Sequence, residues 1–137
     1  LSETVGAENL IAFNIDAHFD VRVAETRNSG TPYRQLLEEK WILPPNFYEV
    51  GWQPQANSPV YFEYLKNVGA NLISLDEFQI QSFTDQIHNP KSTIRNLFWG
   101  FDIDAVRAAD APGVSAPNPT GLSAVEFCAL AAIAGAD

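Results

Sequence analysis

The sequence predicts an α/β domain in which helices cover both faces of a parallel sheet. Short apolar runs alternate with amphipathic stretches along the whole chain, and Gly and Pro residues separate them. Strands that alternate with helices favour parallel pairing, because each crossover helix returns the chain to the same end of the sheet. The 137 residues are enough for one such domain, which we expect to span residues 1–137.

The first predicted strand is Leu10–Ile15, an almost continuous apolar run. A helix from about Pro32 to Lys40 follows, with Thr31 as the expected N-cap and a proline in the first turn. Apolar side chains recur in and just after this segment at helical spacing: Tyr33, Leu36, Leu37 and Trp41. Pro44-Pro45 ends the helix, and Phe47–Trp52 is the second predicted strand.

The next helix begins at Ser58-Pro59, and Gly69 provides its C-cap. Its expected buried face is formed by Tyr61, Tyr64, Leu65 and Val68. Strands are predicted at 71–75 and 97–103, again from apolar runs. Between them, Phe83, Ile87 and Ile94 favour a helix, but Asn89-Pro90 interrupts that pattern.

The last part of the chain combines a long loop with a helix. Gly and Pro residues are frequent from Ala108 to Gly121, which predicts a loop. Ser123 and Glu126 have the spacing of a capping box, and the helix that they open should end near Ala134, before Gly135.

Composition limits the partners and the compartment. The net charge is −9 and the eight Lys and Arg residues are scattered, so the sequence favours neither nucleic acid nor an anionic membrane as a partner. Cys128 is the single cysteine and is expected to be a buried helix residue, not a nucleophile. With no visible signal peptide and no apolar run long enough to span a bilayer, we expect a cytoplasmic protein.

Acidic residues follow the first and the last predicted strands. Asp16, His18 and Asp20 alternate after one strand, and Asp102 and Asp104 alternate after the other. Parallel strands end at the same edge of a sheet, so these five side chains should meet there. Clustered carboxylates repel one another unless cations lie between them, which predicts two divalent metal ions. Either motif alone is also compatible with a hydrogen-bonded turn after a strand.

Three segments together resemble the ureohydrolase superfamily of arginases, agmatinases and formimidoylglutamases. They are 14–20 (Asn-Ile-Asp-Ala-His-Phe-Asp), 101–105 (Phe-Asp-Ile-Asp-Ala) and 111–117 (Ala-Pro-Gly-Val-Ser-Ala-Pro). The resemblance implies a three-layer α/β/α fold with a mainly parallel sheet, of which this chain would be an incomplete segment. It also implies two Mn²⁺ ions per active site.

The same resemblance implies roles for the five residues. Asp16 and Asp102 would bridge the two metals, Asp20 would bind one of them, and His18 and Asp104 would bind the other. Asp20 would also act in catalysis by relaying a proton to the leaving nitrogen.

The substrate is suggested by segment 28–32, Asn-Ser-Gly-Thr-Pro. Arginases and agmatinases usually have a His-Gly step here, whereas the serine resembles formimidoylglutamases, which hydrolyse formimidoyl-glutamate to glutamate and formamide in histidine degradation. We expect four residues to bind this small dicarboxylate: Arg22, Asn28, Ser29 and Arg34. For either arginine, a surface or scaffold salt bridge is an equal alternative.

Two other functions remain open at this stage. The chain could belong to a hydrolase of guanidino substrates, or to a non-catalytic ureohydrolase-like domain. A histidine ligand that the family carries before the first strand, and an acidic residue that it carries after the last helix, have no counterpart in 1–137. The intact protein would then be longer, or an inactive relative. Assembly into a homo-oligomer is also left open.

Overall fold

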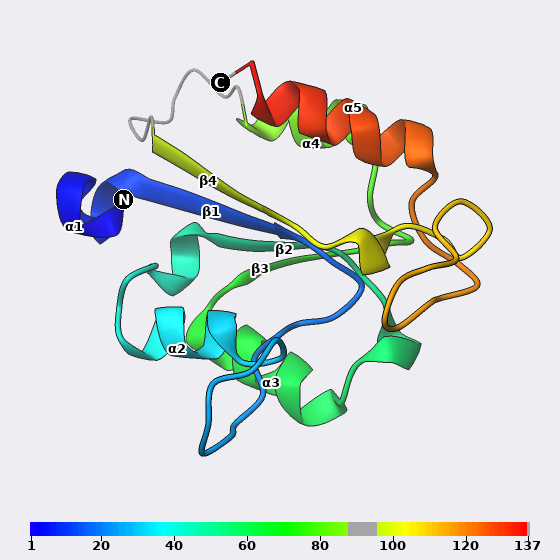
Figure 1. Ribbon diagram of the computed structural model, residues 1–137. Coiled ribbons are helices and arrows are strands. Elements are labelled where there is room, and N and C mark those ends of the chain that lie inside the picture. Colours follow the sequence, from blue (N-terminus) through cyan, green and yellow to red (C-terminus); the bar gives the residue numbers. More distant parts are fainter. Residues whose placement is uncertain (88–95, 137) are drawn as a thin grey trace.

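A parallel sheet of four strands forms the centre of the molecule (Figure 1). The computed structural model describes residues 1–87 and 96–136. Within these ranges the spatial order of the strands is β3-β2-β1-β4. Their bounds are β1 (Leu10–Ile15), β2 (Phe47–Trp52), β3 (Asn71–Ser74) and β4 (Asn96–Phe101). The predicted parallel α/β architecture is therefore confirmed.

Helices lie on both faces of the sheet (Figure 1). One face carries α2 (Pro32–Glu38) and α3 (Pro59–Val68), and the other carries α4 (Ile80–Ile87) and α5 (Ala124–Ala134). A short helix, α1 (Ser2–Val5), precedes β1. None of the helices in the described residues is long and apolar enough to cross a lipid bilayer.

Two apolar layers hold the helices to the sheet, one on each face. On the side of α2 and α3 the buried residues are Leu10, Ala12, Phe19, Val21, Tyr33, Leu37, Ile42, Phe47 and Leu65. On the side of α4 and α5 they are Phe13, Ile15, Val50, Phe83, Ala105, Leu122 and Leu130. β1 contributes alternately to both layers, as expected of a strand that is covered on both faces.

The N-cap residues of the three predicted helix starts differ in the hydrogen bonds that they form. Ser58 Oγ accepts a hydrogen bond from Val60 N at 3.3 Å, and Ser123 and Glu126 form the expected capping box. Thr31 occupies the N-cap of α2, but its side chain makes no capping bond. Its hydroxyl instead donates to Asn28 O at 2.9 Å, which closes the turn before the helix.

Three expectations need correction or completion. Cys128 is exposed and not buried, because Phe127 and Leu130 turn toward the sheet and Cys128 points away from it. β4 ends at Phe101, two residues earlier than predicted. Of the helical pattern between β3 and β4, the structure bears out α4, whereas Asn89-Pro90 and Ile94 lie outside the described residues.

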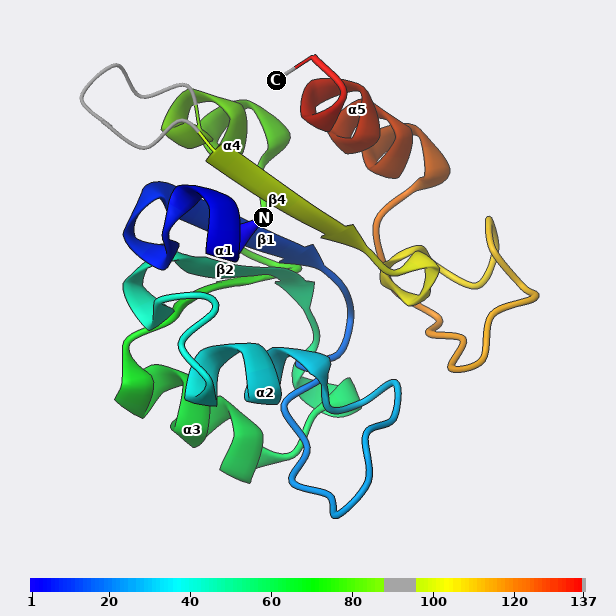
Figure 2. The ribbon, with the colours of Figure 1, turned by 60° about the vertical axis from the view of Figure 1, so that its left-hand side comes forward.

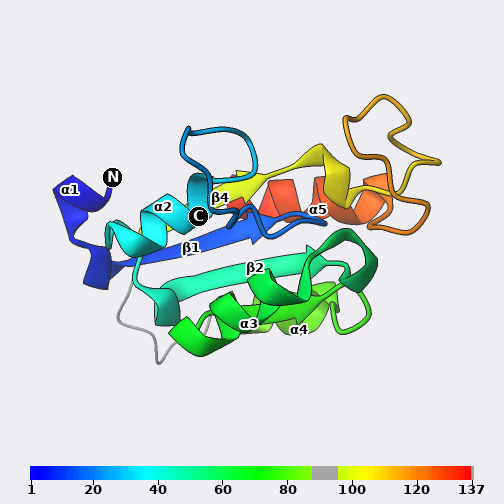
Figure 3. The ribbon, with the colours of Figure 1, turned by 90° about the horizontal axis from the view of Figure 1, so that it is seen from below.

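The carboxyl ends of all four strands lie at one edge of the sheet. Figure 3 shows β1, β2 and β4 pointing in the same direction, β3 pairs with β2 in parallel, and Figure 2 shows the loops after β1 and β4 at that common edge. The backbone pairing even continues beyond the strands, since Asp16 N donates to Val50 O at 3.1 Å and Asp102 N donates to Ile15 O at 2.9 Å. Both acidic motifs therefore start side by side.

Candidate metal centre

The loop after β1 separates its apolar from its polar side chains. Ala17, Phe19 and Val21 are buried in the apolar layer below the loop, and none is more than 1% exposed. Phe19 also packs against Trp52, with ring centroids 5.1 Å apart. Asp16, His18 and Asp20 alternate with these residues and therefore project to the other side. The sequence alternation thus anchors the loop and presents its possible ligands together.

Asp20 has a left-handed backbone, with φ of 49°. Aspartate and asparagine tolerate this conformation better than other residues with a side chain. The Asp20 carbonyl oxygen accepts a hydrogen bond from Tyr33 N at 3.2 Å, which connects the end of the loop to the start of α2.

A short turn places the second pair of acids. The Asp102 carboxylate accepts a hydrogen bond from Asp104 N at 2.8 Å and so starts a 3-10 turn at Ile103–Ala105. This turn is the reason why β4 ends at Phe101. Asp104 is 6% exposed, and Ser115 Oγ, from the loop before α5, lies 3.4 Å from its carboxylate.

The five residues predicted as metal ligands come together at the sheet edge. Carboxylate oxygens of Asp16, Asp20 and Asp102 all lie within 4.8 Å of one another. His18 Nδ1 lies 3.3 Å from Asp16 Oδ1 and 3.9 Å from Asp104 Oδ2. Two overlapping groups of possible ligands thus share Asp16.

Burial and mutual repulsion perturb the acids in this cluster. Burial, together with the charges of Asp16 and Asp102, raises the pKa of Asp20 to about 7. Burial also raises the pKa of Asp16, although hydrogen bonds from His18 oppose that effect. The hydrogen bond to Asp16 in turn raises the pKa of His18. Without a cation, the cluster therefore retains protons at neutral pH.

The donor set fits a divalent cation. Four carboxylates and one imidazole suit a hard or borderline ion such as Mn²⁺. Among the described residues, 1–87 and 96–136, no lysine or arginine forms an ion pair with Asp16, Asp20 or Asp102, and His18 is the basic side chain in contact with Asp16. A cation would release the retained protons and offset the repulsion that raises the pKa of Asp20.

A small pocket of about 200 Å³ adjoins the cluster. Its lining includes one arginine and consists of His18, Phe19, Asp20, Arg22, Ala56, Asn57, Ser58 and Tyr61. The Arg22 side chain crosses directly over Gly30, where even a Cβ atom would lie 2.7 Å from Arg22 Cδ. Glycine at position 30 thus leaves room for the arginine beside the pocket.

The other three residues predicted to bind substrate do not line this pocket. The Asn28 side chain accepts from Gly30 N at 3.0 Å and donates to Thr26 O at 3.2 Å, so it shapes the turn before α2. Ser29 is exposed in the same turn. Arg34 lies on α2, where its guanidinium pairs with Glu38 at 2.6 Å and stacks 3.6 Å from the Tyr64 ring centroid. Arg34 therefore joins α2 to α3.

Sequence reasoning missed a buried polar pair directly below the acids. Glu49 of β2 is 0% exposed and accepts hydrogen bonds from the Asn14 side chain of β1 at 3.1 and 3.3 Å. Burial raises the pKa of Glu49 well above its usual range. On β4, Gly100 lies beside Asn14 of β1, and any side chain at Gly100 would collide with the Tyr33 hydroxyl. The alternation of Phe47, Glu49 and Gly51 in β2 was the signal that could have placed Glu49 inside.

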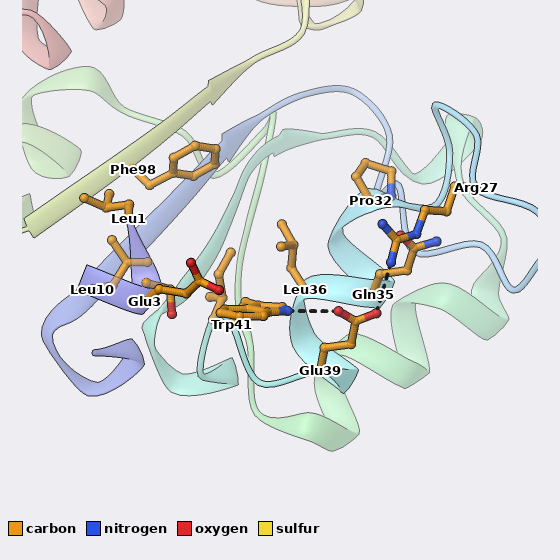
Figure 4. A pocket seen from close by; sticks show the side chains of 12 residues that line it. Leu1, Glu3, Leu10, Arg27, Pro32, Gln35, Leu36, Glu39, Trp41 and Phe98 are labelled. Atoms are coloured by element: carbon orange, nitrogen blue, oxygen red, sulfur yellow. Dashed lines mark hydrogen bonds and ion pairs between the residues drawn. The ribbon is translucent and has the colours of Figure 1, made fainter. Parts of the chain in front are cut away.

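A second hollow, of about 480 Å³, lies near the amino ends of the strands (Figure 4). Apolar side chains from three parts of the chain face it, among them Leu10, Leu36 and Phe98, and Trp41 Nε1 donates to Glu39 at 2.9 Å on its rim. None of the five predicted ligands lines it. The five predicted ligands therefore lie away from this hollow, at the carboxyl edge of the sheet.

Comparison with known proteins agrees with this geometry. Residues 2–136 match the model of the arginase family. The formimidoylglutamase of Staphylococcus carnosus is 34% identical over 113 residues, which cover 80% of this chain and 36% of that protein. The Mn²⁺-containing structure of Trypanosoma cruzi formiminoglutamase superimposes with a TM-score of 0.81 at 31% identity, covering 95% of this chain and 46% of the other.

A third similar structure is the proclavaminate amidino hydrolase of Streptomyces clavuligerus. Its TM-score is 0.84 at 30% identity, with 98% of this chain and 46% of the other covered. The chain thus spans less than half the length of each of these relatives. The match nevertheless includes both acidic motifs and all four strands, and on this ground the chain belongs to the arginase family.

Proposed function

We propose that this protein is a manganese-dependent hydrolase that cleaves formimidoyl-glutamate to glutamate and formamide. The observation that carries the proposal is the convergence of Asp16, Asp20 and Asp102 within 4.8 Å at the carboxyl edge of the sheet. Such a donor set at such an edge is typical of a ligand-binding site in α/β proteins. The similarity to formimidoylglutamases supports the choice of substrate.

The five residues would hold the two ions in two groups. Asp16, Asp20 and Asp102 would bind one ion, and Asp16, His18 and Asp104 the other, with Asp102 also shared. When bound, the ions supply an activated water and stabilise the negative charge that develops on the attacked amidine. Four carboxylates would balance two divalent charges, so the filled site would be close to neutral.

Asp20 is the group suited to move a proton. A carboxylate that binds a cation through one oxygen keeps a second oxygen that can accept and release a proton. In the reaction, water adds to the amidine carbon, the bond from that carbon to the glutamate nitrogen breaks, and the nitrogen needs one proton to leave as an amine. Asp20 lines the pocket beside the ligand cluster and would deliver that proton.

Arg22 would select for an acidic substrate. It lines the pocket next to the cluster, and an arginine can bind a carboxylate through two parallel hydrogen bonds. Asn28 and Ser29 would act indirectly, by shaping the turn that carries Gly30, over which Arg22 crosses.

The decisive experiment compares substrates on the purified protein with Mn²⁺. We expect formimidoyl-glutamate to yield equal amounts of formamide and glutamate, and the activity to disappear when a chelator removes the metal. A protein that binds Mn²⁺ but leaves formimidoyl-glutamate intact would contradict the proposed substrate. A protein that retains no Mn²⁺ would contradict the proposed metal centre.

A guanidino substrate is the second candidate. The resemblance to the proclavaminate amidino hydrolase, at a TM-score of 0.84, favours it. Agmatine, arginine and a guanidino acid are therefore included in the same assay, and urea release from one of them would assign this activity instead.

A further inference from the structure

Asn57 lies between β2 and α3, directly opposite the loop that carries His18. It follows the 3-10 turn Pro54–Ala56 and precedes Ser58, the N-cap of α3, so structured segments hold it on both sides. Its backbone is extended, with φ of −128° and ψ of 146°. The backbone that carries the Asn57 side chain is thus held between two helical segments.

The Asn57 amide is fully engaged with backbone groups. Its Nδ2 donates to Ala17 O at 2.8 Å and to Gln53 O at 2.9 Å, and its Oδ1 accepts from Phe19 N at 2.9 Å. Both hydrogens of the amide and its carbonyl oxygen are therefore used. Gln53 N also donates to Ala17 O at 3.1 Å, which reinforces the same contact.

The two bonds to the loop have a specific placement. The Ala17 carbonyl belongs to the peptide group before His18, and the Phe19 N–H belongs to the peptide group after it. Asn57 therefore forms hydrogen bonds with the peptide groups on both sides of His18, and His18 N donates to the Asp16 carboxylate at 2.8 Å. These contacts leave the backbone of His18 little freedom to rotate.

We propose that Asn57 is a positioning residue for the metal centre, which sets the direction of His18 and Asp20 by holding the two peptide groups around His18. This inference rests on the proposed function, since it assumes that the 16–20 loop binds metal. Asn57 itself binds no ion in this scheme and acts only through the loop.

The matched control is Asn71. Its side chain also donates to two backbone carbonyls, Pro45 O at 2.9 Å and Phe47 O at 3.1 Å, but it does so at the amino ends of the strands. Asn57→Ala and Asn71→Ala thus remove similar numbers of hydrogen bonds, one set at the candidate metal centre and the other far from it.

The experiment measures Mn²⁺ affinity by calorimetry in the purified protein and amide hydrogen exchange in its metal-free form. We expect Asn57→Ala to weaken Mn²⁺ binding about tenfold, as is usual for groups that orient metal ligands. Exchange at the His18 and Phe19 amides should accelerate at the same time. Asn71→Ala should change Mn²⁺ affinity less than twofold and leave exchange in the loop as it is in the wild type.

Asn57→Asp provides a second variant should Asn57→Ala fail to fold. It keeps the acceptor for Phe19 N but loses both donors, so faster exchange at His18 is expected to exceed that at Phe19. Unchanged Mn²⁺ affinity with unchanged exchange in the loop would overturn the proposal. If the wild type binds no Mn²⁺, the proposed function fails, and slow exchange in the Asn57 variants would then overturn the positioning role separately.

Discussion

Asn14 and Glu49 are register partners on β1 and β2, and the Asn14 amide donates to both oxygens of the Glu49 carboxyl group at 3.1 and 3.3 Å. The pair lies on the face of the sheet that carries Tyr33, with Glu49 entirely buried. An ionised carboxylate in this place would cost more free energy than an amide donor recovers. Glu49 therefore keeps its proton to a pH well above its usual range.

Replacing Glu49 by glutamine should make the stability of the metal-free protein less dependent on pH. The folded wild type binds more protons than the unfolded chain above pH 4.5, so its free energy of unfolding falls as pH rises. Glu49→Gln lacks this titrating proton. Its free energy of unfolding should therefore rise relative to that of the wild type by up to about 1.4 kcal/mol per pH unit. Urea denaturation between pH 5 and 8 measures the difference. Glu63→Gln, on the exposed side of α3, is the control, and parallel curves for Glu49→Gln and wild type would contradict the prediction.

Asp102→Asn should abolish activity and reduce the Mn²⁺ that the protein retains. Asparagine keeps the oxygen that accepts from Asp104 N, so the 3-10 turn should survive while one negative charge is lost. Metal analysis after gel filtration, together with the formamide assay, checks both effects. Asp85→Asn, at an exposed position of α4, should match the wild type. Full metal content in Asp102→Asn would show that Asp102 is not a ligand.

Arg22→Ala should raise KM for formimidoyl-glutamate about tenfold or more, while kcat falls much less. The reason is that the variant would lose a carboxylate contact of about 1.5–3 kcal/mol from both the ground state and the transition state. Steady-state kinetics give both constants. Arg34→Ala removes an arginine that pairs with Glu38 and stacks on Tyr64, so it should lower thermal stability and leave KM unchanged. Equal KM values for the Arg22 variant and the wild type would rule out a substrate contact.

Mn²⁺ binding should tighten as pH rises through about 7. Asp20 and His18 both hold their protons to a higher pH than usual, and a cation must displace those protons to bind. Calorimetry at pH 6, 7 and 8 should detect proton release that decreases with rising pH. In Asp20→Asn this dependence should be shallower. A Mn²⁺ affinity that is constant over this pH range would mean that metal binding displaces a proton from neither residue.

Ser123→Ala should destabilise the protein by about 1 kcal/mol, the usual cost of removing an N-cap. The Ser123 hydroxyl and Glu126 form a reciprocal pair at the start of α5, far along the chain from the acidic motifs. Denaturation curves measure the loss. Mn²⁺ affinity should remain that of the wild type, and a large change in it would link α5 to the metal centre in a way that the present contacts do not explain.

The strands could be predicted well because their signals are local. β1 and β2 have the predicted bounds, since apolar residues dominate both strands and turns or loops flank them. β4 ended early for a reason that an apolar pattern does not contain, namely that the Asp102 side chain accepts from the Asp104 backbone. Cys128 was misjudged because α5 is apolar all round, and the pattern alone does not say which side meets the sheet.

The candidate site could be predicted only in part. Asp16, Asp20 and Asp102 were expected to converge because they follow parallel strands, and they do. Asn57 was not recognised, because an asparagine between a turn and a helix N-cap looks like an ordinary turn residue. Its contacts with the 16–20 loop depend on how β1 and β2 pair, which no local pattern describes.

The pairing of β1 with β4 has a consequence for how the protein is made. Ile15 is aligned with Phe101, so the two acidic motifs can meet only after residues 16–101 have been synthesised. Parallel pairing over such a sequence distance is among the slower events in folding. The capacity to capture ions should therefore emerge late, once β4 has joined the sheet beside β1.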